Sequence, residues 1–225
     1  MSASWESYFD STLVCTLTRE TVTSAWAANF RNLIIPKGMH VFLTGMPFAE
    51  ARDTGCHKLL ELGWEFLMFL DDDVICPPDT IPRLMAASNH GEKPIVSGVY
   101  YRRNTPIFPV MLNDLPGGGR QWIVNYKIPD LMEVGYVGAG CLLLHRNVIR
   151  NLPPIGIYNR WFEWRAHRTD LHPDDRLSED FTFCKHARKN GFKIFVDTSI
   201  QCLHGGLSAC KMSPNGGIIE PLTIG

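Results

Sequence analysis

Three consecutive carboxylates, Asp71 to Asp73, are the residues whose types and spacing most directly indicate chemistry. They follow the run Trp64 to Leu70, WEFLMFL, in which all residues but one are apolar and which predicts a strand buried on both faces. Ligands of α/β sheets bind beyond the carboxyl ends of the strands, where these acids would lie. Adjacent anions repel one another, so a divalent metal with a phosphate ligand would explain them. A solvated acidic turn that caps the next helix is the alternative.

Two later features carry side chains of matching chemistry. Glu179 and Asp180 follow Ser178 at an expected helix start, and His204 follows the last expected strand. Acids are favoured in a first helical turn by the helix dipole, and a lone histidine after a strand can be structural. The imidazole could instead ligate a metal. The order of all three features in one α/β frame favours a common site.

The elements that would position these residues alternate through the first hundred residues. Strands are expected at 11–17, 39–44, 64–70 and 94–100, and helices at 21–33, 50–62 and 80–89. Thr18 is a possible N-cap of the first helix. The first two strands should be parallel neighbours in a βαβ unit. The whole alternation predicts a mostly parallel sheet with helices on both faces.

The pattern changes after residue 100. Short strands at 106–112, 120–126 and 131–137 predict a smaller antiparallel extension. The glycines of Gly138-Ala139-Gly140 precede an apolar strand at 141–145 and indicate either close approach of a ligand or a bulge. A polar segment at 165–177 reads as a mobile loop. A helix at 178–190, with Ser178 as N-cap, and a strand at 192–196 complete the pattern.

Composition limits the class of protein. The chain has 225 residues, 45% of them hydrophobic, which is enough for a sizeable core. Its formal net charge of −1 gives no basic field for nucleic acid. No run is long enough for a transmembrane segment and no signal peptide is evident, although peripheral membrane contact remains open. Seven cysteines without a CxxC pair favour free thiols in a reducing compartment, so we expect a cytoplasmic protein.

Taken together, these motifs resemble the GT-A nucleotide-sugar glycosyltransferases, of the small family-two-like kind found in bacteria, archaea and their viruses. The resemblance covers roughly residues 11–205 and rests on Ala51-Arg52-Asp53, Asp71-Asp72-Asp73, Gly138-Ala139-Gly140, Ser178-Glu179-Asp180 and His204. It implies a Rossmann-like GT-A α/β fold in one domain over residues 1–225. Its nucleotide-binding half would be 11–100, its acceptor and catalytic half 101–205, and 206–225 a tail.

The resemblance also implies roles for individual residues. The donor would be a nucleotide-diphosphate sugar such as a UDP- or GDP-sugar, the cofactor Mn²⁺ or Mg²⁺, and the acceptor a glycan, lipid or protein. Asp73 and His204 would ligate the metal, Asp71 would contact the ribose side, and Asp180 would be the general base of an inverting transfer. The other donor-side candidates are Thr16, Thr18, Arg19, Arg52, Asp72, Gly138 and Gly140, and the acceptor-side candidates are Trp161, Trp164 and Glu179.

Several alternatives stay open at this point. The segment Trp161 to Trp164 fits either a sugar-stacking platform or simple core packing. The end of the second strand, Thr44 to Pro47, lacks the acid that often holds the base in this family, so the nucleotide is not assigned. A nucleotidyltransferase is disfavoured because the segment after the first strand, TLTRETVTS, has no glycine. A non-catalytic binding module and a retaining mechanism are the remaining alternatives.

Overall fold

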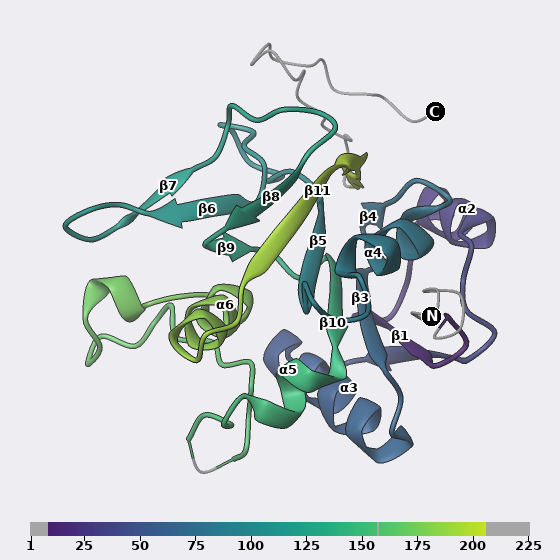
Figure 1. Ribbon diagram of the computed structural model, residues 1–225, viewed down its shortest axis with the longest axis horizontal. Helices are drawn as coiled ribbons and strands as arrows, with labels where there is room; N and C mark the ends of the chain where they lie inside the picture. Colours follow the sequence, from purple (N-terminus) through teal and green to yellow (C-terminus); the bar gives the residue numbers. More distant parts are fainter. Residues whose placement is uncertain (1–8, 157, 206–225) are drawn as a thin grey trace.

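A seven-stranded sheet forms the centre of the computed structural model, which describes residues 9–156 and 158–205 (Figure 1). Its strands lie in the order β2-β1-β3-β10-β5-β11-β8. Their bounds are β1 Thr12–Thr18, β2 Met39–Thr44, β3 Phe66–Asp71, β5 Ile95–Val99, β8 Leu131–Val134, β10 Cys141–His145 and β11 Ile194–Gln201. Only β8 and β10 run against the other strands of this sheet. The predicted α/β class with a mostly parallel sheet is confirmed, whereas the expected tail, 206–225, lies outside the described residues.

The position of β10 differs from a simple alternation. β1 is parallel to both β2 and β3, as the βαβ pattern predicts. β5 does not continue this series beside β3, because β10 lies between them and is antiparallel to both. All five residues of β10 are buried, as an interior strand requires. The insertion places Gly140 beside the acidic turn, where its carbonyl accepts the Asp71 N–H at 3.0 Å.

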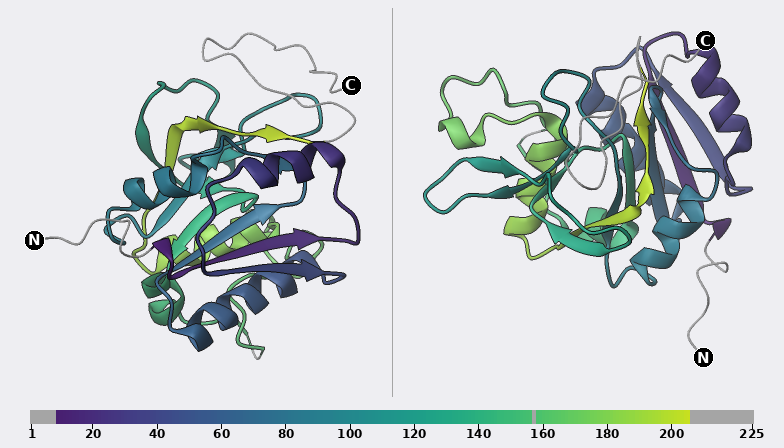
Figure 2. Two further views of the ribbon diagram at one scale, coloured as in Figure 1. Left: turned by 90° about the vertical axis from the view of Figure 1, so that its right-hand side faces the viewer. Right: turned by 90° about the horizontal axis from the view of Figure 1, so that it is seen from above.

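Helices cover both faces of the sheet, as predicted (Figures 1 and 2). The helices are α2 Ser24–Asn32, α3 Phe48–Leu62, α4 Thr80–Ser88, α5 Arg146–Asn151 and α6 Glu179–Lys189. α3, α5 and α6 pack on one face and α4 on the other. Side chains alternate along β3, so Phe66, Met68 and Leu70 face α4 while Leu67 and Phe69 face α3. The next residue in the second series is Asp71, which the alternation directs toward α3.

The antiparallel extension is a three-stranded sheet, β7-β6-β9. Its strands are β6 Met111–Asp114, β7 Arg120–Trp122 and β9 Tyr136–Val137. The predicted strand at 106–112 therefore begins later, and the one at 131–137 is divided at Gly135 between β8 in the main sheet and β9 here. The division has a local cause, since the Gly135 N–H leaves the main ladder to donate to the Leu112 carbonyl at 2.9 Å and to Asn113 Oδ1 at 2.7 Å.

Two helix starts show how capping sets the boundaries. α2 begins at Ser24, because the Thr23 side chain accepts the Trp26 N–H at 3.1 Å; Thr18, the expected cap, is the last residue of β1. Ser178 is the N-cap of α6, as predicted, but its hydroxyl donates to the Asp180 carboxylate.

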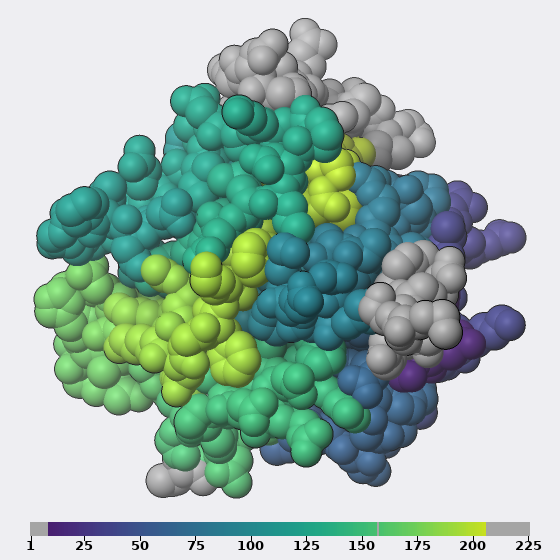
Figure 3. Space-filling model, viewed as in Figure 1, coloured from purple at the N-terminus to yellow at the C-terminus, as the bar shows by residue number. Residues whose placement is uncertain are grey.

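None of the described helices is long and apolar enough to cross a bilayer. In the space-filling view, α4 in blue and β11 in yellow form one continuous surface (Figure 3).

Candidate active site

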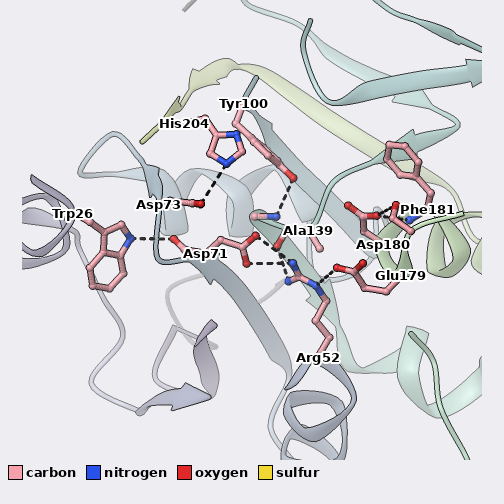
Figure 4. A network of polar contacts seen from close by, with 12 residues as sticks. Trp26, Arg52, Asp71, Asp73, Tyr100, Ala139, Glu179, Asp180, Phe181 and His204 are labelled. Atoms are coloured by element: carbon pink, nitrogen blue, oxygen red, sulfur yellow. Dashed lines mark hydrogen bonds and ion pairs between the residues drawn. The ribbon is translucent and has the colours of Figure 1, made fainter. Parts of the chain in front are cut away.

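The acidic turn lies at the carboxyl end of β3, where a short strand pair brings a distant residue to it. β4 (Val74–Ile75) is antiparallel to β12 (Leu203–His204), with His204 opposite Val74. Nε2 of His204 consequently lies 3.4 Å from Oδ1 of Asp73 (Figure 4). The structure thus brings together the two residues that the sequence suggested as metal ligands.

Hydrogen bonding orients the His204 ring. Nδ1 bonds to the Tyr101 carbonyl and must carry the ring proton, which leaves Nε2 unprotonated and able to accept a hydrogen bond or bind a metal. Burial lowers the pKa of His204 and so favours this neutral imidazole. Arg103 Nε donates to His204 Nε2 at 3.1 Å, and the same guanidinium pairs with Asp73. The guanidinium of Arg103 thus contacts both side chains.

Arg52 of α3 connects the acidic turn to α6. It is 3% exposed and donates to both carboxylate oxygens of Asp71 at 3.2 Å and to Glu179 Oε1 at 3.4 Å. It also donates to the Ala139 carbonyl at 3.1 Å. Burial alone would lower the pKa of Arg52, but the Asp71 and Glu179 carboxylates raise it well above its ordinary value. The buried Arg52 side chain thus connects β3, α6 and the segment before β10 through hydrogen bonds.

Glu179 and Asp180 occupy different environments. Glu179 is 4% exposed, and burial raises its pKa to about 7, although Arg52 opposes the shift. The Asp180 side chain is partly exposed, and its Oδ1 accepts from the Ser178 hydroxyl and from the Phe181 N–H at 2.8 Å. Within the described residues its Oδ2 has no hydrogen-bond partner. Asp180 therefore has an oriented carboxylate with one available oxygen.

Helix α2 holds the acidic turn from the other side. Nε1 of Trp26 donates to the Asp71 carbonyl at 3.0 Å. The Asn29 side chain donates to the Cys76 carbonyl at 2.7 Å and accepts the Cys76 N–H at 3.0 Å. These bonds fix the main chain on both sides of Asp73. The sequence alone indicated no role for either residue, because both lie in an ordinary amphipathic helix.

The two glycines before β10 make room for Tyr100. A Cβ at Gly138 would overlap the Tyr100 hydroxyl, and one at Gly140 would lie 3.1 Å from Asp71 Oδ2. The Tyr100 hydroxyl accepts the Gly140 N–H at 3.2 Å. Close packing of protein groups therefore accounts for both glycines in this structure. Their suggested contact with the donor stays a prediction.

A cleft of about 540 Å³ opens over the acidic turn. It is lined by Arg19, Thr21, Thr23, Phe48, Asp71, Asp72, Asp73, Arg103, His204 and Gly205. The cleft combines carboxylates, an imidazole and two arginines, which suits a metal and a phosphorylated ligand. Asp180 is not part of this lining; it follows Glu179 on α6, and its hydrogen bonds are to Ser178 and Phe181 (Figure 4). Arg103 and Phe48 had no assigned role; the position of Arg103 after β5, at the same edge of the sheet, was an available signal.

Besides the residues of the Arg52 network, Asp180 and the two glycines, four further suggested residues lie outside this cleft lining. Thr16 is fully buried and bonds His40 Nε2 at 3.0 Å, and Thr18 is 8% exposed with no hydrogen-bond partner for Oγ1 in the described residues. Trp161 is 5% exposed and donates to the Leu152 carbonyl, so it packs in the core. Trp164 is 47% exposed, and its acceptor role stays a prediction.

A larger hollow lies elsewhere, at the start of β3. It measures about 710 Å³ and is formed mainly by the end of α3 and by α5, with Trp161 in its wall. No carboxylate is among its lining residues, so we place the chemistry in the smaller cleft.

Asp53 of α3 makes contacts that the sequence did not predict. Its Oδ1 accepts the Trp161 and Phe162 N–H groups at 2.8 and 3.0 Å, which anchors this segment to α3. Burial raises the pKa of Asp53 to about 6, although these two bonds oppose the shift. Arg52 and Asp53 thus attach two later segments of the chain to one helix.

Comparison with known proteins gives the family. The family model "Glycosyl transferase family 2" matches residues 39–152, just over half of the chain. Curated protein sequences give no significant match. Two solved structures share the fold: A197 from STIV has a TM-score of 0.62 and 18% identity, with 92% of both chains covered. GalNAc-T7 with UDP, GalNAc and Mn²⁺ has a TM-score of 0.58 and 11% identity over 86% of this chain, which spans only 43% of that one. The chain belongs to glycosyl transferase family 2 and is a glycosyltransferase of GT-A fold.

Proposed function

We propose that this enzyme transfers a sugar from a nucleotide-diphosphate donor, such as a UDP- or GDP-sugar, to a hydroxyl of a glycan, lipid or protein acceptor. The reaction depends on a divalent metal held by Asp73 and His204 and proceeds with inversion, with Asp180 as general base. The observation that carries the proposal is the meeting of Asp73 and His204, from two paired strands, at the wall of one cleft.

The donor set fits Mn²⁺ or Mg²⁺. Carboxylate oxygen suits both ions, and one imidazole favours Mn²⁺ slightly. His204 Nε2 is unprotonated, and the contacts of the Arg103 cation with both His204 and Asp73 support a site for positive charge at these two side chains. When bound, the metal would supply Lewis-acid stabilisation of the diphosphate leaving group. The similarity to GalNAc-T7, solved with UDP and Mn²⁺, supports this assignment.

The chain's own residues would position the donor. Asp71 has both oxygens bonded to Arg52, so its carboxylate is fixed at the cleft wall, where it would meet the ribose side of the nucleotide. Arg19 and Arg103 line the same cleft and can pair with phosphate oxygens. The position of Arg52 supports a positioning role toward Asp71 and Glu179, since its guanidinium is already engaged by both.

Asp180 is the better of the two α6 acids for accepting a proton. Glu179 is buried and ion-paired to Arg52, whereas Asp180 keeps one oxygen without a partner among the described residues. Ser178 and Phe181 hold the other oxygen and orient the carboxylate. In the transition state Asp180 would take the acceptor hydroxyl proton, a contribution of about 10²–10⁴-fold in rate.

Replacing Asp180 by Asn tests the proposal and separates an enzyme from a binding module. We expect release of nucleoside diphosphate from UDP- or GDP-sugars, assayed with a panel of acceptors, to fall by about 10²–10⁴-fold. Donor binding with Mn²⁺, measured by thermal shift, should be retained. Asp79→Asn, at the exposed N-cap residue of α4, is the matched control and should leave both unchanged. Undiminished turnover in Asp180→Asn would contradict the assigned base.

A further inference from the structure

Three cysteines from distant parts of the chain meet on the α4 side of the sheet. Cys76, Cys141 and Cys202 are at most 3% exposed, and their sulfurs all lie within 4.8 Å of one another. The Sγ atoms of Cys76 and Cys202 are 3.4 Å apart, and those of Cys76 and Cys141 are 3.9 Å apart. All three are free thiols in this structure. Neither the family match nor the proposed transfer reaction uses them.

Strand pairing singles out Cys76 and Cys202 within this cluster. In the β4–β12 ladder, Leu203 lies opposite Ile75 and His204 opposite Val74. Continuing this register by one residue sets Cys202 opposite Cys76. Directly opposed residues of antiparallel strands have Cα atoms about 4.5–5.5 Å apart, inside the range of about 4.4–6.8 Å that a disulfide requires. A side-chain rotation can therefore bring the two sulfurs to bonding distance.

Charge argues against a metal in the same place. A thiophilic ion would need thiolates, and three of them would leave net negative charge in apolar surroundings. Among the described residues, no lysine, arginine or histidine side chain hydrogen-bonds to these sulfurs, and the cluster packs against residues such as Val74, Leu143 and Ile200. A disulfide is neutral, so its burial carries no such cost.

We propose that Cys76 and Cys202 form a reversible disulfide, a modification site directly behind the candidate metal ligands. The oxidant is a low-molecular-weight disulfide such as oxidised glutathione. One cysteine thiolate attacks a glutathione sulfur and releases one glutathione thiol, and the second cysteine then displaces the other glutathione. The two cysteine thiols lose two electrons and two protons in total, and glutathione disulfide is reduced to two thiols. Access requires opening of the β4–β12 pair, whose ladder has two residue pairs.

The disulfide would tie the two strands that carry Asp73 and His204. Cys202 lies two residues before His204, and Cys76 lies three residues after Asp73. Covalent closure restricts the relative motion of the strands, so it should reduce the entropy lost when a metal binds between them. We therefore expect several-fold tighter Mn²⁺ binding in the oxidised form, an effect that rests on the proposed function.

The experiment compares protein treated with reductant and with oxidised glutathione. Each sample is alkylated after denaturation, weighed by intact mass spectrometry and digested for peptide mapping. The oxidised form should lose two of the seven alkylation sites and yield a cross-linked peptide that joins Cys76 to Cys202. Cys141→Ser, the matched control inside the cluster, should keep the cross-link, and Cys202→Ser should lose it. Calorimetric titration with Mn²⁺ on both forms gives the affinity ratio.

The results distinguish the proposed disulfide from its proposed effect on metal binding. The proposed disulfide would be overturned by any of three results. These are seven alkylated cysteines after oxidation, a Cys76–Cys141 cross-link, or a thiophilic metal bound by all three sulfurs. A mapped Cys76–Cys202 bond whose formation leaves Mn²⁺ affinity unchanged would refute the link to the metal ligands but not the disulfide. A mapped bond in a protein that binds no Mn²⁺ in either form would count against the proposed function alone.

Discussion

At the scale of residues, one buried arginine determines where the acids of the site can be. Arg52 pairs with Asp71 and Glu179, which come from different halves of the chain. Buried charges are tolerated when they are paired and hydrogen-bonded, so the three groups depend on one another. The strand and helix patterns, and the order of the motifs, allowed Asp71, Asp73, Glu179, Asp180 and His204 to be chosen from sequence. The patterns could not show that Arg52 bonds to two of them, since that contact exists only after the helices pack.

Gly138→Ala tests whether close packing, and not access for a ligand, explains the glycine. The added methyl group would overlap the Tyr100 hydroxyl, and we expect a loss of about 1–3 kcal/mol in the free energy of unfolding. Urea denaturation measures the cost. The same change in a Tyr100→Phe background should cost less, because the overlapping oxygen is gone. Equal costs in both backgrounds would mean that Tyr100 is not the obstacle.

Asp53 gives a stability change with pH whose sign follows from its pKa. Burial raises the folded-state pKa from 3.8 to about 6, so the protonated form is favoured in the folded protein. Its contribution to stability is fully present below the ordinary value and is lost as the pH rises through about 6. From about pH 4 to about pH 7, the wild type should lose roughly 1–3 kcal/mol relative to Asp53→Asn, measured by urea denaturation. Parallel pH profiles of the two proteins would contradict this prediction.

At the scale of elements, the arrangement of β10 was the least predictable feature. Its apolar run CLLLH predicts a buried strand but does not specify which strands it pairs with. The structure inserts it between β3 and β5, antiparallel to both. The segment 131–137 was similarly read as one strand, although Gly135 divides it between two sheets. Apolar periodicity predicts that a segment forms a strand, whereas the strands that it pairs with depend on contacts between distant segments.

Helix α2 supports the acidic turn through hydrogen bonds of Trp26 and Asn29, and a Trp26→Phe change would remove the one that the indole donates. Trp26 donates to the Asp71 carbonyl at 3.0 Å. Its loss should cost about 1 kcal/mol of stability and weaken donor binding with Mn²⁺ by about 3–10-fold, as the turn relaxes. Trp161→Phe is a matched control because its indole donates to the Leu152 carbonyl, away from the cleft. Equal effects of the two changes on donor affinity, measured by calorimetric titration, would show that α2 does not position the turn.

At the scale of the whole molecule, one sheet edge gathers the site from segments far apart in the chain. β3 leads into the acidic turn, and α3 supplies Arg52, which pairs with Asp71 and Glu179. α6 supplies the proposed base, and β12 supplies His204. Parallel strands end at the same edge, so the sequence order of the motifs was enough to predict their convergence. The contacts of the surrounding side chains, those of Tyr100 and Trp26, could be found only in the packed structure. The family match and the shared fold agree with this arrangement.

The most direct test of the metal site is thermal unfolding with UDP- and GDP-sugars, with and without Mn²⁺. A ligand that binds only the folded state raises the unfolding temperature by mass action. We expect a rise that needs both donor and Mn²⁺, that is lost in Asp73→Asn and in His204→Ala, and that persists in the Asp79→Asn control. A donor-induced rise that keeps its metal dependence in both ligand variants, or no rise with any donor in the presence of Mn²⁺, would contradict it.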